Sequence, residues 1–71
     1  MSIYIAITNK DGWGKGATIQ EAKSKARAES RLGAGLKYEF RKCEDEDAYI
    51  DGMGRLCAMR GTSIETVTEG K

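Results

Sequence analysis

The chain of 71 residues contains no histidine, no proline, two cysteines and a single tryptophan. Without histidine there is no Ser/His/Asp triad, no Cys/His dyad and no zinc site built on imidazole. Two cysteines alone do not close a structural zinc site, and they are too few for a disulfide scaffold. We therefore expect no catalytic residues, no metal ligands and no cofactor, which makes an enzyme the disfavoured class.

Long hydrophobic runs are absent too, and nothing resembles a signal peptide, because polar residues follow the apolar start at 3–7. We expect a cytoplasmic protein that does not contact membranes, with Cys43 and Cys57 as reduced thiols that pack as small hydrophobic residues. One domain, 1–71, is predicted. A chain of this length buries only about 60% of its extended surface, so a partner or second copy often completes such a fold.

Charge is unevenly distributed although the net charge is only +1. Residues 10–42 contain nine basic and four acidic side chains, whereas residues 43–71 contain three basic and seven acidic ones. The first part of the sequence is therefore net positive and the second part net negative, and folding can keep these charges apart or interleave them.

The first half of the chain predicts a strand, a glycine-rich connection and a helix. Residues 2–8 alternate between isoleucines and other residues, which indicates a strand whose isoleucine face covers the core. The glycines of 12–16 favour a tight strand-to-helix joint; a phosphate-binding loop is the alternative, although the spacing fits neither GxxxxGK[ST] nor GxGxxG. Thr18 and Glu21 form a capping-box pattern at the helix start. The buried stripe of this helix consists mostly of small side chains, and Gly33 and Gly35 are expected to end it near Leu32.

The second half predicts strands only. Residues 36–43 alternate, with Leu36, Tyr38 and Phe40 facing inward, and residues 63–68 favour a short last strand. Between them, the glycines of 52–54 indicate a hairpin turn or a bulge, and we favour the hairpin. The cysteines could lie opposite each other across it. The predicted fold class is α+β, in the order β-α-β-β(-β), with one helix on one face of a small, mainly antiparallel sheet and the other face open.

Three features are candidate contact sites, and we expect the first two to form one contact and the third to form another. Trp13 either packs in the core or anchors a partner. The positively charged flank Lys23, Arg27 and Arg31 follows the helix at i, i+4 spacing; it either contacts a partner, with nucleic acid as one option, or is simply solvated.

The third candidate is the acidic run, which presents charge to a basic protein surface or forms a solvated loop. It comprises Glu44, Asp45, Glu46 and Asp47.

Two resemblances add to these patterns. The run Gly14 to Ala26 resembles the G-x-T-x-x-E-A-x-x-x-A helix entry of HicB-like antitoxins, which are small α+β proteins that bind a toxin; those domains have three strands before this helix, whereas one is predicted here. In size, order of elements and charge contrast the chain is similar to small phage-encoded inhibitors of host defence, including anti-CRISPR proteins. That second resemblance implies a host protein as the partner.

The leading hypothesis is therefore a small non-catalytic binding protein, encoded by a phage or mobile element, that inhibits or modulates a host macromolecule by protein–protein contact. The alternative is a small nucleic-acid-binding module that uses the positively charged helix flank. A small-anion site at residues 12–16 is a weaker third hypothesis. Homodimerisation through open sheet faces or edges is compatible with the two leading hypotheses.

Overall fold

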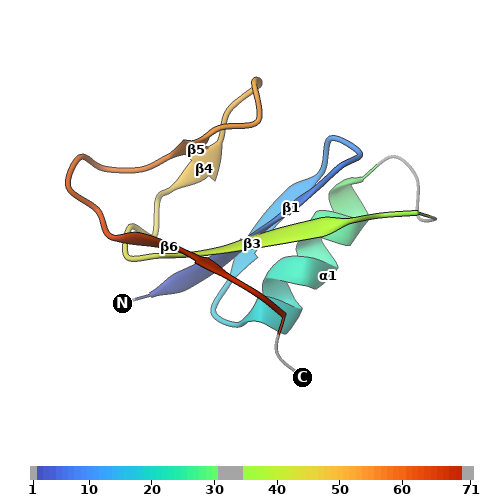
Figure 1. Ribbon diagram of the computed structural model, residues 1–71, viewed down its shortest axis with the longest axis horizontal. Coiled ribbons are helices and arrows are strands. Elements are labelled where there is room, and N and C mark those ends of the chain that lie inside the picture. Colours follow the sequence, from blue (N-terminus) through green and yellow to red (C-terminus); the bar gives the residue numbers. More distant parts are fainter. Residues whose placement is uncertain (1, 31–34, 70–71) are drawn as a thin grey trace.

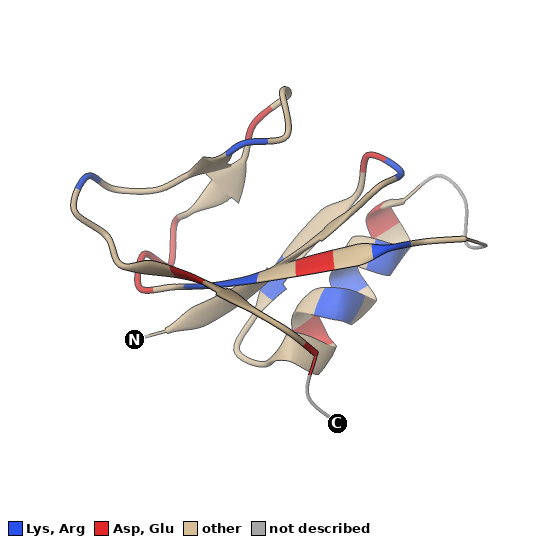
Figure 2. Cartoon of the chain, in the orientation of Figure 1, with Lys and Arg blue, Asp and Glu red and all other residues tan. Residues whose placement is uncertain are grey.

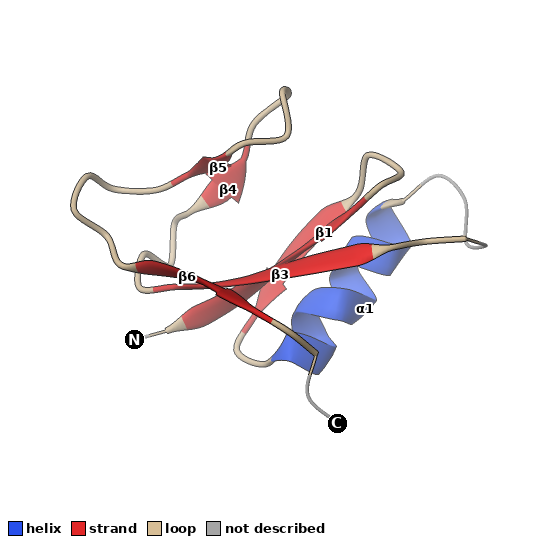
Figure 3. Ribbon diagram, in the orientation of Figure 1, coloured by secondary structure: helices blue, strands red, loops and turns tan. Residues whose placement is uncertain are grey.

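In a computed structural model, which describes residues 2–30 and 35–69, one helix covers one face of a four-stranded sheet (Figure 1). A small two-stranded sheet projects from the opposite side of it (Figure 3). The elements in chain order are β1 (Ile3–Thr8), β2 (Trp13–Gly16), α1 (Ile19–Glu29), β3 (Tyr38–Cys43), β4 (Tyr49–Ile50), β5 (Leu56–Cys57) and β6 (Ile64–Val67). The predicted α+β class is confirmed.

The larger sheet has the strand order β2-β1-β3-β6, and every neighbouring pair is antiparallel. The predicted strands at 2–8, 36–43 and 63–68 correspond to β1, β3 and β6. The element missing from the predicted order is β2. Residues 13–16 were expected to be a joint between strand and helix, but they pair with β1 across a tight turn. Residues 13–16 are therefore a paired strand that ends two residues before the helix start at Thr18 and Ile19, and the small-anion site at 12–16 stays a prediction.

The glycines of 12–16 have a packing role that the structure makes clear. They occupy alternate positions, so all three face α1. A Cβ atom at Gly14 would lie 2.5 Å from the Cβ of Lys25 and 2.6 Å from the amide nitrogen of Ala26. Only glycine lets the backbone of β2 approach the helix this closely.

The helix matches the prediction at its start and differs at its end. Thr18 is the N-cap, and its hydroxyl accepts from the amide of Glu21 at 3.1 Å. The Glu21 carboxylate accepts from the amide of Ala17 at 3.1 Å, one residue before the expected partner. The helix ends at Glu29 with Ser30 as C-cap, before the predicted Leu32. Of the two predicted C-terminal glycines, Gly33 lies outside the described residues.

Two small cores lie on opposite faces of the sheet. On the helix face, Ala22 and Ala26 are fully buried against Ala6 and Phe40, as the small-residue stripe predicts. The opposite face carries the isoleucines of β1, which pack with a second cluster, including the buried residues Cys43, Ala48 and Ile50. The prediction that this face is open was therefore wrong, because the chain between β3 and β6 folds back across it.

Within that returning chain, the predicted hairpin around 52–54 is confirmed by the antiparallel pairing of β4 with β5. The two cysteines do not face each other. Cys57 pairs with Tyr49, whereas Cys43 pairs with Ile3 and is fully buried, so it packs as a small hydrophobic residue.

Candidate functional site

The connection between β3 and β6 is the most unusual part of the fold. These strands are antiparallel neighbours, for which a turn of about two to five residues is enough. Here the chain leaves β3 at residue 43 and returns only at residue 64. Figure 1 shows this 44–63 segment extending from the sheet, with the β4–β5 hairpin within it. Connections of such length in small folds are often functional.

The 44–63 segment and the residue that follows it carry exposed large apolar side chains. The exposed large hydrophobic residues of the described parts all fall between residues 49 and 64: Tyr49 (51% exposed), Met53 (78%), Met59 (71%) and Ile64 (43%). Tyrosine and methionine are enriched in protein–protein interfaces relative to the rest of the surface. The inner side behaves differently, because Ala48 and Ile50 are buried against the sheet.

Hydrogen bonds hold the base of the segment on the sheet. The ammonium of Lys15, in β2, donates to the carbonyl oxygens of Glu46 at 2.7 Å and Ala48 at 2.9 Å. The Asp45 carboxylate accepts from the amide of Met59 at 2.6 Å and from that of Asp47 at 2.9 Å. The bond from Met59 to Asp45 joins the two ends of the segment, and the bonds from Lys15 attach the first end to β2. The exposed methionines therefore belong to an ordered surface.

Asp51 organises the tip in the same way. One of its carboxylate oxygens accepts from the amides of Met53 and Arg55, both at 2.9 Å. The Arg55 guanidinium lies 3.5 Å from the other oxygen. The amide of Arg55, and then that of Met53, holds the pKa of the Asp51 carboxyl below its usual range, because both bonds favour the ionised form.

The acidic run, residues 44–47, also stabilises the loop to which it belongs, which the sequence did not reveal. The amide of Met59, and after it that of Asp47, keeps the pKa of Asp45 below the ordinary value of 3.8. The Glu44 carboxylate accepts from the hydroxyl of Ser2 at 2.7 Å. Glu46 and Asp47 are exposed. Aspartate carboxylates commonly accept hydrogen bonds from backbone amides of their own loop. This preference was the signal that the sequence offered.

The positively charged helix flank is partly engaged within the molecule. The Lys23 ammonium lies 2.8 Å from the Glu69 carboxylate and 5.2 Å from the centroid of the Tyr38 ring. Arg27 is exposed, and Arg31 lies outside the described residues. Figure 2 shows basic and acidic residue positions interleaved along the helix and the strands.

Trp13 is not next to this flank. It lies in β2, at one edge of the sheet, and packs with the cluster on the face away from α1. Lys23 reaches Glu69, which follows β6 at the other edge. Since Trp13 is half-buried, it contributes to the core while part of it stays accessible. A single contact containing both residues is not formed by this fold.

The positively charged residues in and just before β3 also lie on both faces of the sheet. Arg41 pairs with Ile5 and therefore faces away from the helix. Lys37, four residues earlier, faces the same way because side chains alternate between the faces of an extended chain. Lys42 pairs with Tyr4 on the helix face. Among the described residues, the basic side chains of helix and strand therefore do not form one continuous surface of the kind that nucleic-acid binding would use.

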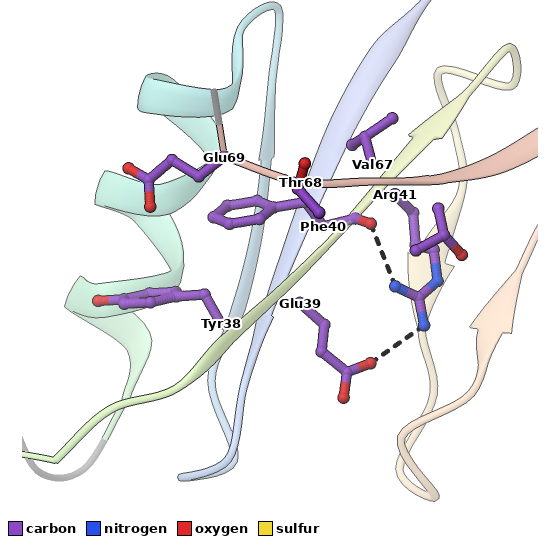
Figure 4. Close-up of a pocket in the computed structure, with 8 residues that line it drawn as sticks. Tyr38, Glu39, Phe40, Arg41, Val67, Thr68 and Glu69 are labelled. Carbon is purple, nitrogen blue, oxygen red and sulfur yellow. Dashed lines mark hydrogen bonds and ion pairs between the residues drawn. The ribbon is translucent and has the colours of Figure 1, made fainter. Parts of the chain in front are cut away.

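A shallow notch lies where β6 ends beside β3, with a volume of about 420 Å³. Figure 4 shows the rings of Tyr38 and Phe40 pointing toward α1, while Arg41 lies on the other side of β3 and contacts Glu39. The two rings stack with centroids 6.0 Å apart. No buried side-chain nitrogen or oxygen in the described chain lacks a hydrogen-bond partner, so none marks an internal ligand site.

Residues 2–30 and 35–69 contain no group of three or more Cys, Asp or Glu side chains placed to hold a metal ion. Over the same ranges, α1 is too short and too polar to span a lipid bilayer. Comparison with known proteins found no matching family model, no similar curated protein and no similar solved structure. The geometry of the chain itself is therefore the basis for a functional assignment.

Proposed function

We propose that this is a small, non-catalytic, cytoplasmic binding protein that acts through protein–protein contact, and that the outer side of the 44–63 segment supplies the contact. The observation that carries the proposal is that the exposed large hydrophobic side chains of the described residues all fall within 49–64, with Met53 and Met59 more than two-thirds exposed. Exposing methionine to water costs free energy, which a partner surface would recover by covering it.

The surroundings of these residues indicate the chemistry of the partner. Arg55 and Arg60 are exposed within two residues of Met53 and Met59 along the chain. An apolar centre with a charged rim is the usual arrangement of a protein interface. The complementary partner surface has an apolar groove with acidic residues around it. That this partner is a host macromolecule inhibited by a phage protein stays a prediction from the sequence.

Capture from a bacterial lysate, with variants of the immobilised chain, tests this proposal. The double variant Met53→Glu/Met59→Glu places charges on the apolar surface without touching either core. Ala28→Glu is the matched control, because it adds the same side chain at an exposed helix position. We expect one identified partner to be retained by the wild type and Ala28→Glu, and bound at least about tenfold more weakly by the double variant.

The outcomes distinguish the surfaces. Partner retention by Met53→Glu/Met59→Glu together with loss on Arg27→Glu would transfer the contact to the positively charged helix flank and contradict the proposal. A concentration-dependent dimer in light scattering that the double variant abolishes would assign the surface to a second copy of this chain. The outer edges of β2 and β6 are also free for pairing within the described sheet, so dimerisation unaffected by the double variant would point to those edges.

A further inference from the structure

A recess of about 510 Å³ lies under the tip of the β4–β5 hairpin. The sheet contributes Ile7, Thr8, Asn9, Lys37, Glu39 and Arg41, and the hairpin contributes Gly54, Arg55 and Leu56. The recess therefore has walls from two parts of the chain that are distant in sequence. Its volume falls in the range of about 300–1,000 Å³ that is typical of small-molecule sites.

The charged groups around this recess are mostly positive. Lys37 and Arg41 line the sheet side, Arg55 lines the hairpin side, and Glu39 is the only carboxylate among the lining residues. Lys37 is fixed in place by its backbone, which donates to the Asn9 side chain at 2.9 Å and accepts from the Asn9 amide at 3.2 Å. Positive charges on both walls of the recess favour an anion between them.

The arginines at the recess already have partners within the protein. The Arg41 guanidinium donates to the Glu39 carboxylate at 3.0 Å and to the Phe40 carbonyl at 3.1 Å. Arg55 lies 3.5 Å from Asp51. Each ion pair has one solvent-exposed member, Glu39 at 71% and Arg55 at 73%, so solvent weakens the pair and an anion held between the walls can compete with it.

We propose that this recess binds a small organic anion that carries phosphate or carboxylate groups. Lys37, Arg41 and Arg55 hold the charged groups, and Ile7 and Leu56 contact the apolar body of the ligand. A volume of about 510 Å³ matches a small molecule. The recess borders the proposed protein contact at Arg55, whose guanidinium also lies 3.8 Å from the Met53 sulfur. Lys37 and Arg41 belong to the recess alone.

Amide NMR spectra test the proposal at low ionic strength, with pyrophosphate and citrate as the two probes. For at least one probe we expect saturable shifts at Lys37 and Leu56, and binding about tenfold weaker in Lys37→Gln/Arg55→Gln. The probe that binds tells phosphate from carboxylate chemistry. Lys42→Gln is the control, because Lys42 lies on β3 next to Arg41 but faces the helix. It is expected to bind as the wild type does.

A variant that is expected to bind more tightly distinguishes a lost contact from misfolding, since misfolding can only weaken binding. Glu39→Gln removes the carboxylate that competes for Arg41, so it is expected to bind the probe more tightly than the wild type. The proposal is overturned if neither probe produces saturable shifts. It is also overturned if Lys42→Gln weakens binding as much as Lys37→Gln/Arg55→Gln, since that result would indicate general charge screening.

Discussion

The Lys15 ammonium donates to the carbonyl oxygen of Ala48 at 2.9 Å and so joins edge strand β2 to the base of the 44–63 segment. A second bond from the same ammonium, to the carbonyl of Glu46, reinforces this attachment. Lys15→Met keeps the apolar stem and removes both bonds. We expect about 1 kcal/mol lower free energy of unfolding in urea titrations.

Faster hydrogen exchange at Ala48 and Ile50 should accompany that change, because the base of the segment loses its anchor. Lys25→Met, at an exposed helix position, is the control and should leave both quantities unchanged. Equal effects of the two substitutions would show that Lys15 acts only through general charge.

Gly14 tests the close packing of β2 on the helix. Gly14→Ala places a methyl group 2.6 Å from the amide nitrogen of Ala26, so backbone has to move. The expected loss of stability is about 1–3 kcal/mol. Gly52→Ala is the matched control, since nothing lies within 4 Å of its added Cβ and its φ is not positive. If both variants melt at the same temperature, the contact between β2 and the helix is looser than described.

This strand also shows what could and could not be predicted from the sequence. The alternation of residues 2–8 and the capping pattern at Thr18 depend on local chemistry, and both predictions were confirmed. The strand at 13–16 was missed because glycine disfavours strands in isolation. Its packing depends on the close approach of the helix at Lys25 and Ala26, which is a tertiary effect. Glycines at alternate positions opposite a small-faced helix were the available signal.

The candidate surface was missed for a related reason. The sequence shows Met53 and Met59 as ordinary apolar residues, and their exposure follows only from the path of the 44–63 segment. That path depends on long-range bonds such as the one from the Met59 amide to Asp45. Charge patterns drew attention to the helix flank, where Lys23 is instead bonded to Glu69.

Thr8 connects the first turn of the sheet to the end of the helix. Its buried hydroxyl lies 2.7 Å from the Ser30 hydroxyl and accepts from the amides of Lys10 and Gly12. Thr8→Val leaves these amides without that acceptor, and we expect unfolding free energy to fall by about 1–3 kcal/mol. Thr66→Val, at an exposed position, should change it by less than about 0.5 kcal/mol.

Ser30→Ala provides the partner for a double-mutant cycle with Thr8→Val. The two losses should add to more than the loss of the double variant, because both remove the same hydroxyl pair. Strict additivity would argue against this bond.

Asp45 should make stability depend on pH. Its pKa in the folded state is below the ordinary value of 3.8, so the folded state favours the ionised carboxyl. The contribution is complete well above pH 3.8 and is lost as the pH falls through that value toward the lowered folded pKa. Asp51 acts in the same direction. Urea midpoints should therefore fall less between pH 6 and pH 3 in Asp45→Asn/Asp51→Asn than in the wild type, and an equal or larger fall in the variant would contradict this assignment.

The contact surface is tested most directly by hydrogen–deuterium exchange of the chain with and without its captured partner. The proposed function predicts that the partner slows exchange over residues 49–60, centred on Met53 and Met59, and leaves the helix residues 23–27 unchanged. Slowed exchange confined to residues 23–27, with 49–60 unaffected, would contradict it.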